Sequence, residues 1–331
     1  MAPMFLQVDG LGKRFGVSSG QQSLEALHDV SFTVQAGEIL SFIGPSGAGK
    51  TTLLKCIAGL EHPDAGTLAF ASPPSKAHPV ILVFQDFLLF PHLTVFENVA
   101  FGLRARRLPR AEILEKVRGM LGYFGLEDKQ HAYPAHLSAG QKQRTAIARA
   151  MVVEPALLLL DEPFANLDRN LKLQTARFIR TTQKRFGVTT ISVTHDLEEA
   201  FAMSDRLGLM LDGQLVQCGT ARELYHAPAT AEAAAFLGPV NIVPGRLLQQ
   251  LGLTAGQDGP LLVRPESLHL TPDPNGPGVI AEAEFAGHYW KYQVTAFGLE
   301  LSVYSQANGL SPGNRVSITL AASEFPMEQA S

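Results

Sequence analysis

The sequence has few cysteines and no long apolar run. Only Cys56 and Cys218 occur among its 331 residues, and neither belongs to a spacing that binds a metal. This scarcity favours a reduced compartment over a disulfide framework. No apolar stretch approaches the ~20 residues of a membrane-spanning helix, and the N-terminus lacks the features of a signal peptide. We therefore expect any membrane attachment to come through partner subunits.

The sequence also lacks an excess of positive charge. Its 27 lysines and arginines against 31 acidic residues give a formal net charge of −4. Such a balance gives no electrostatic case for binding nucleic acid. The length of 331 residues exceeds that of one average domain and is enough for two hydrophobic cores.

A glycine-rich phosphate-binding pattern stands near the N-terminus. Residues 44–51 fit G-x-x-x-x-G-K-[ST], directly after the apolar run 39–43 and before apolar residues at helical spacing. Glycines let backbone N–H groups face phosphate oxygens, Lys50 offers a point charge to the β- and γ-phosphates, and Thr51 offers a hydroxyl to Mg²⁺. The residues expected to bind the nucleotide here are Gly44, Pro45, Ser46, Gly47, Ala48, Gly49, Lys50, Thr51 and Thr52.

Two acids follow a second apolar run. Residues 157–160 are all leucine, which is typical of a strand covered on both faces, and Asp161 and Glu162 come next. Asp161 is expected to hold the Mg²⁺ shell, and Glu162 to polarise the attacking water, because phosphoryl transfer needs charge neutralisation and an oriented nucleophile. Taken alone, the same pattern also fits an apolar strand that ends in a solvated acidic turn.

Between these motifs lies a helix start, Leu137–Arg144, followed by apolar residues at helical spacing. Ser138 is a good N-cap, and exposed N–H groups at a helix start attract anions. Read by itself, this segment is either an ordinary capped helix or a second phosphate contact.

The order of these motifs resembles the ATP-binding subunit of ABC transporters over the first two thirds of the chain. The resemblance implies that Phe15 stacks on adenine and that Gln85 senses Mg²⁺ and the γ-phosphate. It also implies that His195 contacts the γ-phosphate and that Asp168 belongs to a loop along a dimer seam. In isolation, Phe15 also fits a core aromatic residue, Gln85 a strand end, and His195 a buried histidine.

The same resemblance implies an ATP site that is shared between two chains. Ser138, Gly140 and Gln141 of one chain would cover the nucleotide held by the phosphate loop of the other, in a homodimer or with a paired ATPase subunit. Bound ATP would then hold the two chains together, and its hydrolysis would let them separate. Ala139 departs from the family's usual glycine, which removes glycine-only backbone angles. Because Ser138, Gly140 and the N–H groups remain, function is expected to survive; a weaker or slower closure is the alternative.

The predicted fold is an α/β P-loop ATPase domain over residues 1–238, with an inserted helical lobe at about 87–155. Frequent prolines and short β-like pieces after Gly238 predict a small C-terminal β-barrel domain over 239–331, which resembles the TOBE module of binding-protein-dependent importers. Phe87–Leu103 is rich in aromatic and aliphatic residues and predicts a docking groove for a membrane subunit. Taken one by one, its residues fit the lobe's own core equally well.

The resulting hypothesis is the ATP-hydrolysing energy subunit of an importer at the cytoplasmic face of the inner membrane. ATP and Mg²⁺ are its expected cofactors, and its expected partners are two membrane-spanning permease subunits and, indirectly, an extracytoplasmic solute-binding protein, with no nucleic acid. The stretch Phe90–Phe96 resembles the ferric-iron and polyamine branch. Three alternatives stay open: a soluble ABC-type ATPase acting on nucleic acid or ribosomes, a P-loop kinase or GTPase, and a non-enzymatic switch.

Overall fold

A computed structural model describes residues 2–16, 24–164, 169–245, 247, 250, 260–306 and 309–320. The chain divides into two compact units, Met1–Ala221 and Arg222–Ser331. Each unit has its own hydrophobic core. The boundary between the two units follows Ala221 and lies before the predicted domain boundary at Gly238. The predicted domain limits stay predictions.

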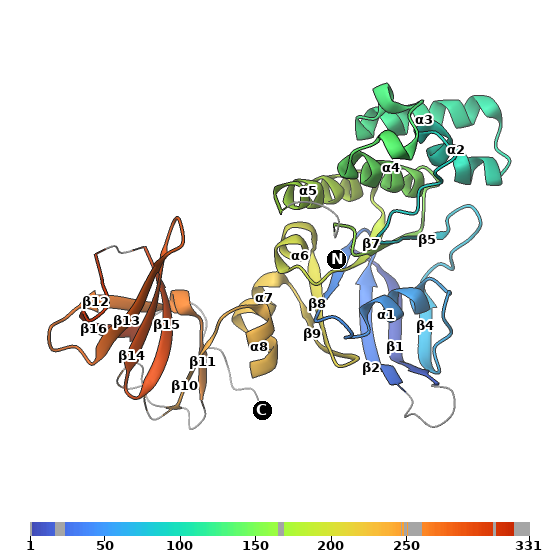
Figure 1. The fold of residues 1–331 in the computed structure, drawn as a ribbon. Helices are drawn as coiled ribbons and strands as arrows, with labels where there is room; N and C mark the ends of the chain where they lie inside the picture. The colour runs from blue at the N-terminus through green and yellow to red at the C-terminus, as the bar shows by residue number, and fades with distance from the viewer. Residues whose placement is uncertain are drawn as a thin grey trace. The chain divides into compact units, whose positions relative to one another are not determined.

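The first unit is built on a six-stranded sheet with the order β5-β6-β7-β3-β8-β9 (Figure 1). All neighbouring strands are parallel except β8 and β9, which are antiparallel. The strands are β3 (Ile39–Ile43), β5 (Val80–Val83), β6 (Leu157–Asp161), β7 (Thr189–Val193), β8 (Arg206–Leu211) and β9 (Gln214–Gly219).

Strand β6 shows why the sheet is covered on both faces. Successive side chains of a strand point to opposite faces. Leu158 and Leu160 belong to one core cluster, whereas Leu157 and Leu159 belong to another on the opposite face. All four leucines are buried, so the unbroken apolar run of the sequence is the pattern of a strand between two layers.

One of these layers is a second, antiparallel sheet with the order β2-β1-β4. Its strands are β1 (Met4–Phe15), β2 (Leu24–Gln35) and β4 (Ala65–Phe70), and helix α1 (Lys50–Ile57) shares their core cluster.

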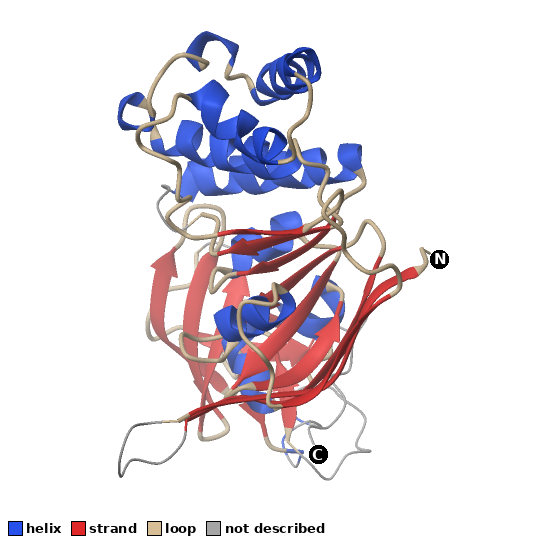
Figure 2. Cartoon of the chain, turned by 90° about the vertical axis from the view of Figure 1, so that its right-hand side faces the viewer, coloured by secondary structure: helices blue, strands red, loops and turns tan. Residues whose placement is uncertain are grey.

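The other layer is helical. Helices α2 (Val95–Ala105), α3 (Arg110–Phe124) and α4 (Ala139–Met151) contact one another and form the helical lobe (Figure 1). Figure 2 shows this group of helices set apart from the strands. The remaining elements of the unit are α5 (Arg169–Phe186), α6 (Leu197–Met203) and the short 3₁₀ turns Glu127–Lys129 and Pro134–His136. No helix among the described ranges is both long and apolar enough to cross a membrane.

Two of the helical-lobe helices begin with a reciprocal cap. Thr94 and Glu97 form a capping box at the start of α2, and Ser138 and Gln141 form another at the start of α4. In each box a side-chain oxygen accepts from the N3 backbone N–H, while the N3 side chain accepts from the N-cap N–H, which satisfies donors that the helix leaves free.

The second unit is mainly antiparallel. A five-stranded sheet has the order β12-β16-β13-β14-β15, and β10 pairs with β11. The end strands β12 and β15 also lie close together, so the sheet curls toward a barrel. The elements are α7 (Ala221–His226), α8 (Ala231–Leu237), β10 (Asn241–Val243), β11 (Leu261–Val263), the 3₁₀ turn Pro265–Ser267, β12 (Leu268–Pro272), β13 (Gly278–Phe285), β14 (Trp290–Ala296), β15 (Leu299–Ser305) and β16 (Arg315–Leu320). The predicted fold class, an α/β domain followed by a small β domain, is confirmed.

Arg264 explains why the contacts group α7 and α8 with the second unit. This guanidinium is only 3% exposed and donates hydrogen bonds to the carbonyl oxygens of Tyr225, Ala234, Gly238 and Pro239. It also lies 4.2 Å from the centre of the Tyr225 ring. A buried guanidinium needs such partners, so it fixes the helix ends to the start of the β domain.

Candidate functional site

Three parallel strands deliver the predicted catalytic residues to one edge of the large sheet. The phosphate loop follows β3, Asp161 ends β6 with Glu162 after it, and His195 lies two residues beyond β7. In the register Asp161 lies opposite Val193, and the backbone N–H of Glu162 donates to the carbonyl of Val193 at 3.0 Å. The carboxyl edge of a parallel α/β sheet is the usual place for a ligand.

The phosphate loop requires glycine at two positions where other chain segments approach closely. A Cβ on Gly44 would lie 2.1 Å from the carbonyl oxygen of Met210, and one on Gly49 would lie 2.2 Å from that of Ala26. Both glycines also have positive φ angles, which side chains disfavour. The glycines of the motif therefore allow the backbone itself to form the cradle.

Lys50 holds its ammonium over this loop. Its Nζ donates to the carbonyl oxygens of Gly44 and Pro45, each at 2.8 Å, and the residue is only 6% exposed. Burial lowers the pKa of Lys50, while the negative charges of Glu162 and Asp161 act to raise it. A buried cation flanked by carboxylates and backbone amides is a ready partner for phosphate oxygens.

Thr51 and Asp161 provide a pair of hard oxygen ligands. The Thr51 hydroxyl donates to Asp161 Oδ1 at 3.1 Å, although 110 residues separate them in sequence. Burial raises the pKa of Asp161, and the hydrogen bond from Thr51 opposes this rise. Hydroxyl and carboxylate oxygens beside a phosphate cradle fit Mg²⁺, which binds through one or two protein oxygens together with substrate phosphates.

Glu162 and His195 meet beside this pair. Glu162 Oε1 lies 3.1 Å from His195 Nδ1, and their side chains are 24% and 52% exposed. Glu162 has a φ of 44°, in the left-handed region that few non-glycine residues adopt. Such strain occurs where the surrounding structure fixes a side-chain direction, and here it turns Glu162 toward His195.

The Ser138 segment forms the capped start of α4. Ser138 Oγ accepts from the Gln141 N–H at 3.3 Å, and Gln141 Oε1 accepts from the Ser138 N–H at 2.9 Å. Ala139 is the first helical residue, so its side chain occupies ordinary helical backbone and causes no strain there. Among the described residues, a Cβ on Gly140 would meet Leu171, at an ordinary 3.6 Å. Packing against the described part of the chain therefore does not demand glycine at position 140.

The structure shows no direct contact between the other predicted site residues it describes, Phe15 and Gln85, and the residues above. Phe15 ends β1 and is half-buried, with Lys13 Nζ 5.4 Å from its ring centre. Gln85 lies two residues after β5 and is exposed. Asp168 lies outside the described residues, so the structure says nothing of its position.

The predicted docking segment Phe87–Leu103 is partly core. Phe87, Val95, Val99 and Leu103 are buried, whereas Leu88 and Phe101 are 54% and 46% exposed. The sequence pattern does not distinguish these two groups, because apolar residues stand on both sides of α2.

Arg149 was not predicted from the sequence, yet it holds the turn after Gln85. It donates to the carbonyls of Phe87 and Leu88 at 3.0 and 2.9 Å, and both of these residues have positive φ angles. The sequence indicates only that Arg149 lies on the helix that Ser138 caps.

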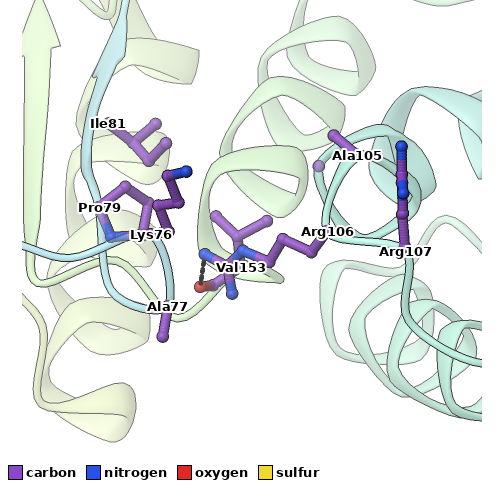
Figure 3. Close-up of a pocket in the computed structure, with 9 residues that line it drawn as sticks. Lys76, Ala77, Pro79, Ile81, Ala105, Arg106, Arg107 and Val153 are labelled. Carbon is purple, nitrogen blue, oxygen red and sulfur yellow. Dashed lines mark hydrogen bonds between the residues drawn. The ribbon is translucent and has the colours of Figure 1, made fainter.

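A pocket of about 630 Å³ lies beside the helical lobe (Figure 3). Figure 3 shows Lys76 on one wall and Arg106 and Arg107 on the other, with Val153 between them. Arg106 donates to the Val153 carbonyl at 2.7 Å. Its described lining includes three cations and no acid. The members are Lys76, Ala77, Pro79, Ile81, Gly102, Ala105, Arg106, Arg107 and Val153.

Comparison with known proteins gives two family matches. The family described as ABC transporter matches residues 27–165, and the family described as TOBE domain matches residues 261–324. In structure, the chain resembles a dimeric ATP-binding cassette in a post-hydrolysis state bound to ADP and Pi. That match has a TM-score of 0.57 and 28% identity, over 65% of this chain and 98% of the other.

Similar curated proteins are import subunits. The Fe(3+) ions import ATP-binding protein FbpC of Agrobacterium fabrum is 45% identical over 69% of this chain and 66% of its own length. FbpC 1 of Rhizobium meliloti is 37% identical over 96% of both chains. The molybdate/tungstate import ATP-binding protein WtpC of Pyrococcus horikoshii is 46% identical over 66% of this chain and 65% of its own length.

Asp161→Asn is expected to stabilise the ligand-free protein at neutral pH. Because burial raises the pKa of Asp161, the folded chain binds this proton more tightly than the unfolded chain does, and stability falls as pH rises through that window. The substitution removes this loss of folding stability, so the midpoint temperature of unfolding rises by a few degrees at pH 7. The gain shrinks as pH falls toward about 3.9, where the unfolded carboxyl also protonates.

Asp64→Asn is the control with the opposite sign. The backbone N–H of Arg14, with Lys13, lowers the pKa of Asp64, so this carboxylate stabilises the fold above its unfolded pKa and its removal lowers the midpoint at pH 7. Thermal unfolding from pH 4 to 7 checks both variants. A shift for Asp161→Asn that does not change with pH would contradict the assignment.

Proposed function

The chain belongs to the ATP-binding subunits of ABC importers, and we propose that its Gly44–Thr52 loop, Asp161, Glu162 and His195 bind and hydrolyse ATP to drive uptake of a small polar solute. Family membership rests on relatives that match the chain over most of its length. The observation that carries the residue assignment is the meeting of Thr51 with Asp161 and of Glu162 with His195 at one sheet edge.

Each group of the site has a distinct task in this proposal. The loop N–H groups and Lys50 would hold the phosphates, Thr51 and Asp161 would hold Mg²⁺, and Gln85, after the neighbouring strand, would sense the same ion. Bound Mg²⁺ would neutralise charge on the phosphate oxygens. Phe15 stacks on adenine, which an aromatic ring does with any purine face.

Glu162 orients the attacking water and accepts its proton. A carboxylate within hydrogen-bond reach of the nucleophile suits this task, and His195 at 3.1 Å from Glu162 Oε1 holds the carboxylate and approaches the γ-phosphate. This arrangement needs no covalent enzyme intermediate, because phosphoryl transfer depends mainly on positioning and electrostatics.

A second copy or a paired ATPase subunit completes the site. We propose that Ser138, Gly140, Gln141 and Asp168 of one chain face the nucleotide held by the other. The environment of Gly140 supports this, because its described neighbours would tolerate a side chain there, whereas a phosphate that approaches the backbone would not. The capped start of α4 also presents N–H groups that favour an anion.

Two permease subunits are proposed to dock on the helical lobe. Leu88 and Phe101 are exposed apolar residues beside the turn that follows Gln85. The cationic pocket has walls from the same helix, α2, and three cations without an acid favour an acidic segment of the permease. Such docking places the subunit peripherally on the cytoplasmic face of the inner membrane.

Ferric iron is the proposed cargo, because the Agrobacterium and Rhizobium relatives carry that name. The Pyrococcus relative, named for molybdate and tungstate, makes an oxyanion the second candidate. An extracytoplasmic binding protein would deliver the solute. Faster turnover of the assembled complex with a ferric-loaded binding protein than with a molybdate-loaded one would identify iron. The relatives named above are all import subunits, and none favours the alternative of acting on nucleic acid.

Glu162→Gln is expected to keep ATP binding and to lower turnover by about 100-fold or more, because the amide cannot accept the proton of water. Lys50→Ala is expected to lose ATP binding itself. Nucleotide binding by fluorescence and phosphate release report these two properties separately. Glu232→Gln is the matched control, because it removes the same charge at an exposed position on α8. It should behave like the wild type. Steady turnover by Glu162→Gln at the wild-type rate would refute the role of Glu162.

Arg107→Glu is expected to weaken permease docking without changing the isolated ATPase. Reversing one charge of the pocket places like charges across the proposed contact, which lowers permease-stimulated turnover by about tenfold. Arg110→Glu, an exposed neighbour outside the pocket, makes the same charge change and should have little effect. Equal stimulation of both variants would place the docking surface elsewhere.

A further inference from the structure

The Thr194 hydroxyl connects the two chain neighbours of His195 to a buried acid. It contacts the backbone of Asp196 on one side and the carboxylate of Glu199 on the other. Thr194, immediately before it, is only 2% exposed. The Thr194 hydroxyl donates to Glu199 Oε2 at 2.7 Å and accepts from the Asp196 N–H at 3.0 Å. The backbone on both sides of His195 is therefore tied to Glu199.

The acid is held in turn by a lysine from another helix. Lys172, in the first turn of α5, places Nζ 2.9 Å from Glu199 Oε1 and 3.4 Å from Asp196 Oδ2. The Glu199 side chain is 4% exposed and that of Lys172 is 19% exposed. Asp196 also caps α6, because its Oδ1 accepts from the N–H groups of Glu198 and Glu199.

Burying the ion pair between Lys172 and Glu199 costs free energy, so its presence needs a physical explanation. Removing two charges from water often costs as much as their attraction returns, and a buried pair is weak evidence for stability alone. Burial raises the pKa of Glu199, and the hydrogen bond from Thr194 and the ion pair with Lys172 oppose that rise. What the pair does supply is a fixed direction for the backbone that carries His195.

We propose that Lys172 is a positioning residue, which acts through Glu199 and Thr194 to hold His195 at Glu162 during ATP hydrolysis. The inference rests on the catalytic role proposed for His195. The ion pairs of Lys172 are with Glu199 and with Asp196, which is next to His195 in the chain, and none of its described contacts is with the phosphate loop. Its loss therefore changes the rate of hydrolysis and leaves ATP binding intact.

Lys172→Met tests this by separating rate from binding. We expect kcat to fall about tenfold or more, because small displacements of a catalytic group have large effects on rate, while the Kd for ATP stays unchanged. Lys172→Arg, which keeps the charge and the bonds, should restore turnover. Lys184→Met is the matched control, since Lys184 lies on the same helix and pairs with Asp205 at 2.6 Å, away from His195. Wild-type turnover by Lys172→Met would overturn the proposal.

The double variant Lys172→Met/Glu199→Met guards against misfolding. It removes both charges, and replacing a buried pair by apolar residues is often tolerated, so a folded but slow enzyme is expected. Wild-type turnover by this variant would also overturn the proposal.

A second comparison uses His195→Ala as background. There, Lys172→Met should cause no further loss, because its target is already absent. An equal loss in both backgrounds would show that Lys172 does not act through His195. Wild-type turnover by His195→Ala alone would instead refute the role of His195.

Discussion

The parallel pairing of β6 with β7 and of β7 with β3 decides where every charged group of the ATP site lies. Because these strands run in one direction, the phosphate loop, the two acids and His195 emerge at the same edge. Their side chains then meet across large sequence distances, as Thr51 meets Asp161. A slip of one residue in β6 would exchange which leucines face each of the two layers, and it would move Asp161 and Glu162 away from Thr51 and His195.

That geometry brings charged groups together at one edge of the sheet. Lys50 lies against its own loop carbonyls in the field of Asp161 and Glu162, so one cation and two acids share a partly buried edge. Helix α4 is joined to the same edge, because Gln143 Nε2 donates to the carbonyl of Pro163 at 2.7 Å. The helix that begins at Ser138 and the loop that carries Glu162 are thus linked within one chain, so the proposed closure of a dimer at Ser138 would have a physical route to Glu162.

Local sequence signals predicted much of this arrangement. The four leucines before Asp161 indicated a strand buried on both faces, and Ser138 indicated a helix cap; both features are present. The contacts that span the fold were beyond such signals, because nothing local to Lys172 shows that it pairs with Glu199. The docking segment was difficult for another reason: the apolar residues of α2 fill the core on one side and reach the surface at Phe101 on the other. Asp168 lies outside the described residues and keeps only its sequence-based assignment.

The central claim is that each ATP site takes its phosphate loop from one chain and its Ser138 segment from another. Mixing two inactive variants, Lys50→Ala and Ser138→Arg, tests it most directly. A mixed dimer holds one site with an intact loop from the second variant and an intact Ser138 segment from the first, so steady ATP turnover should reappear on mixing. A mixture that stays as inactive as its two components would contradict the account.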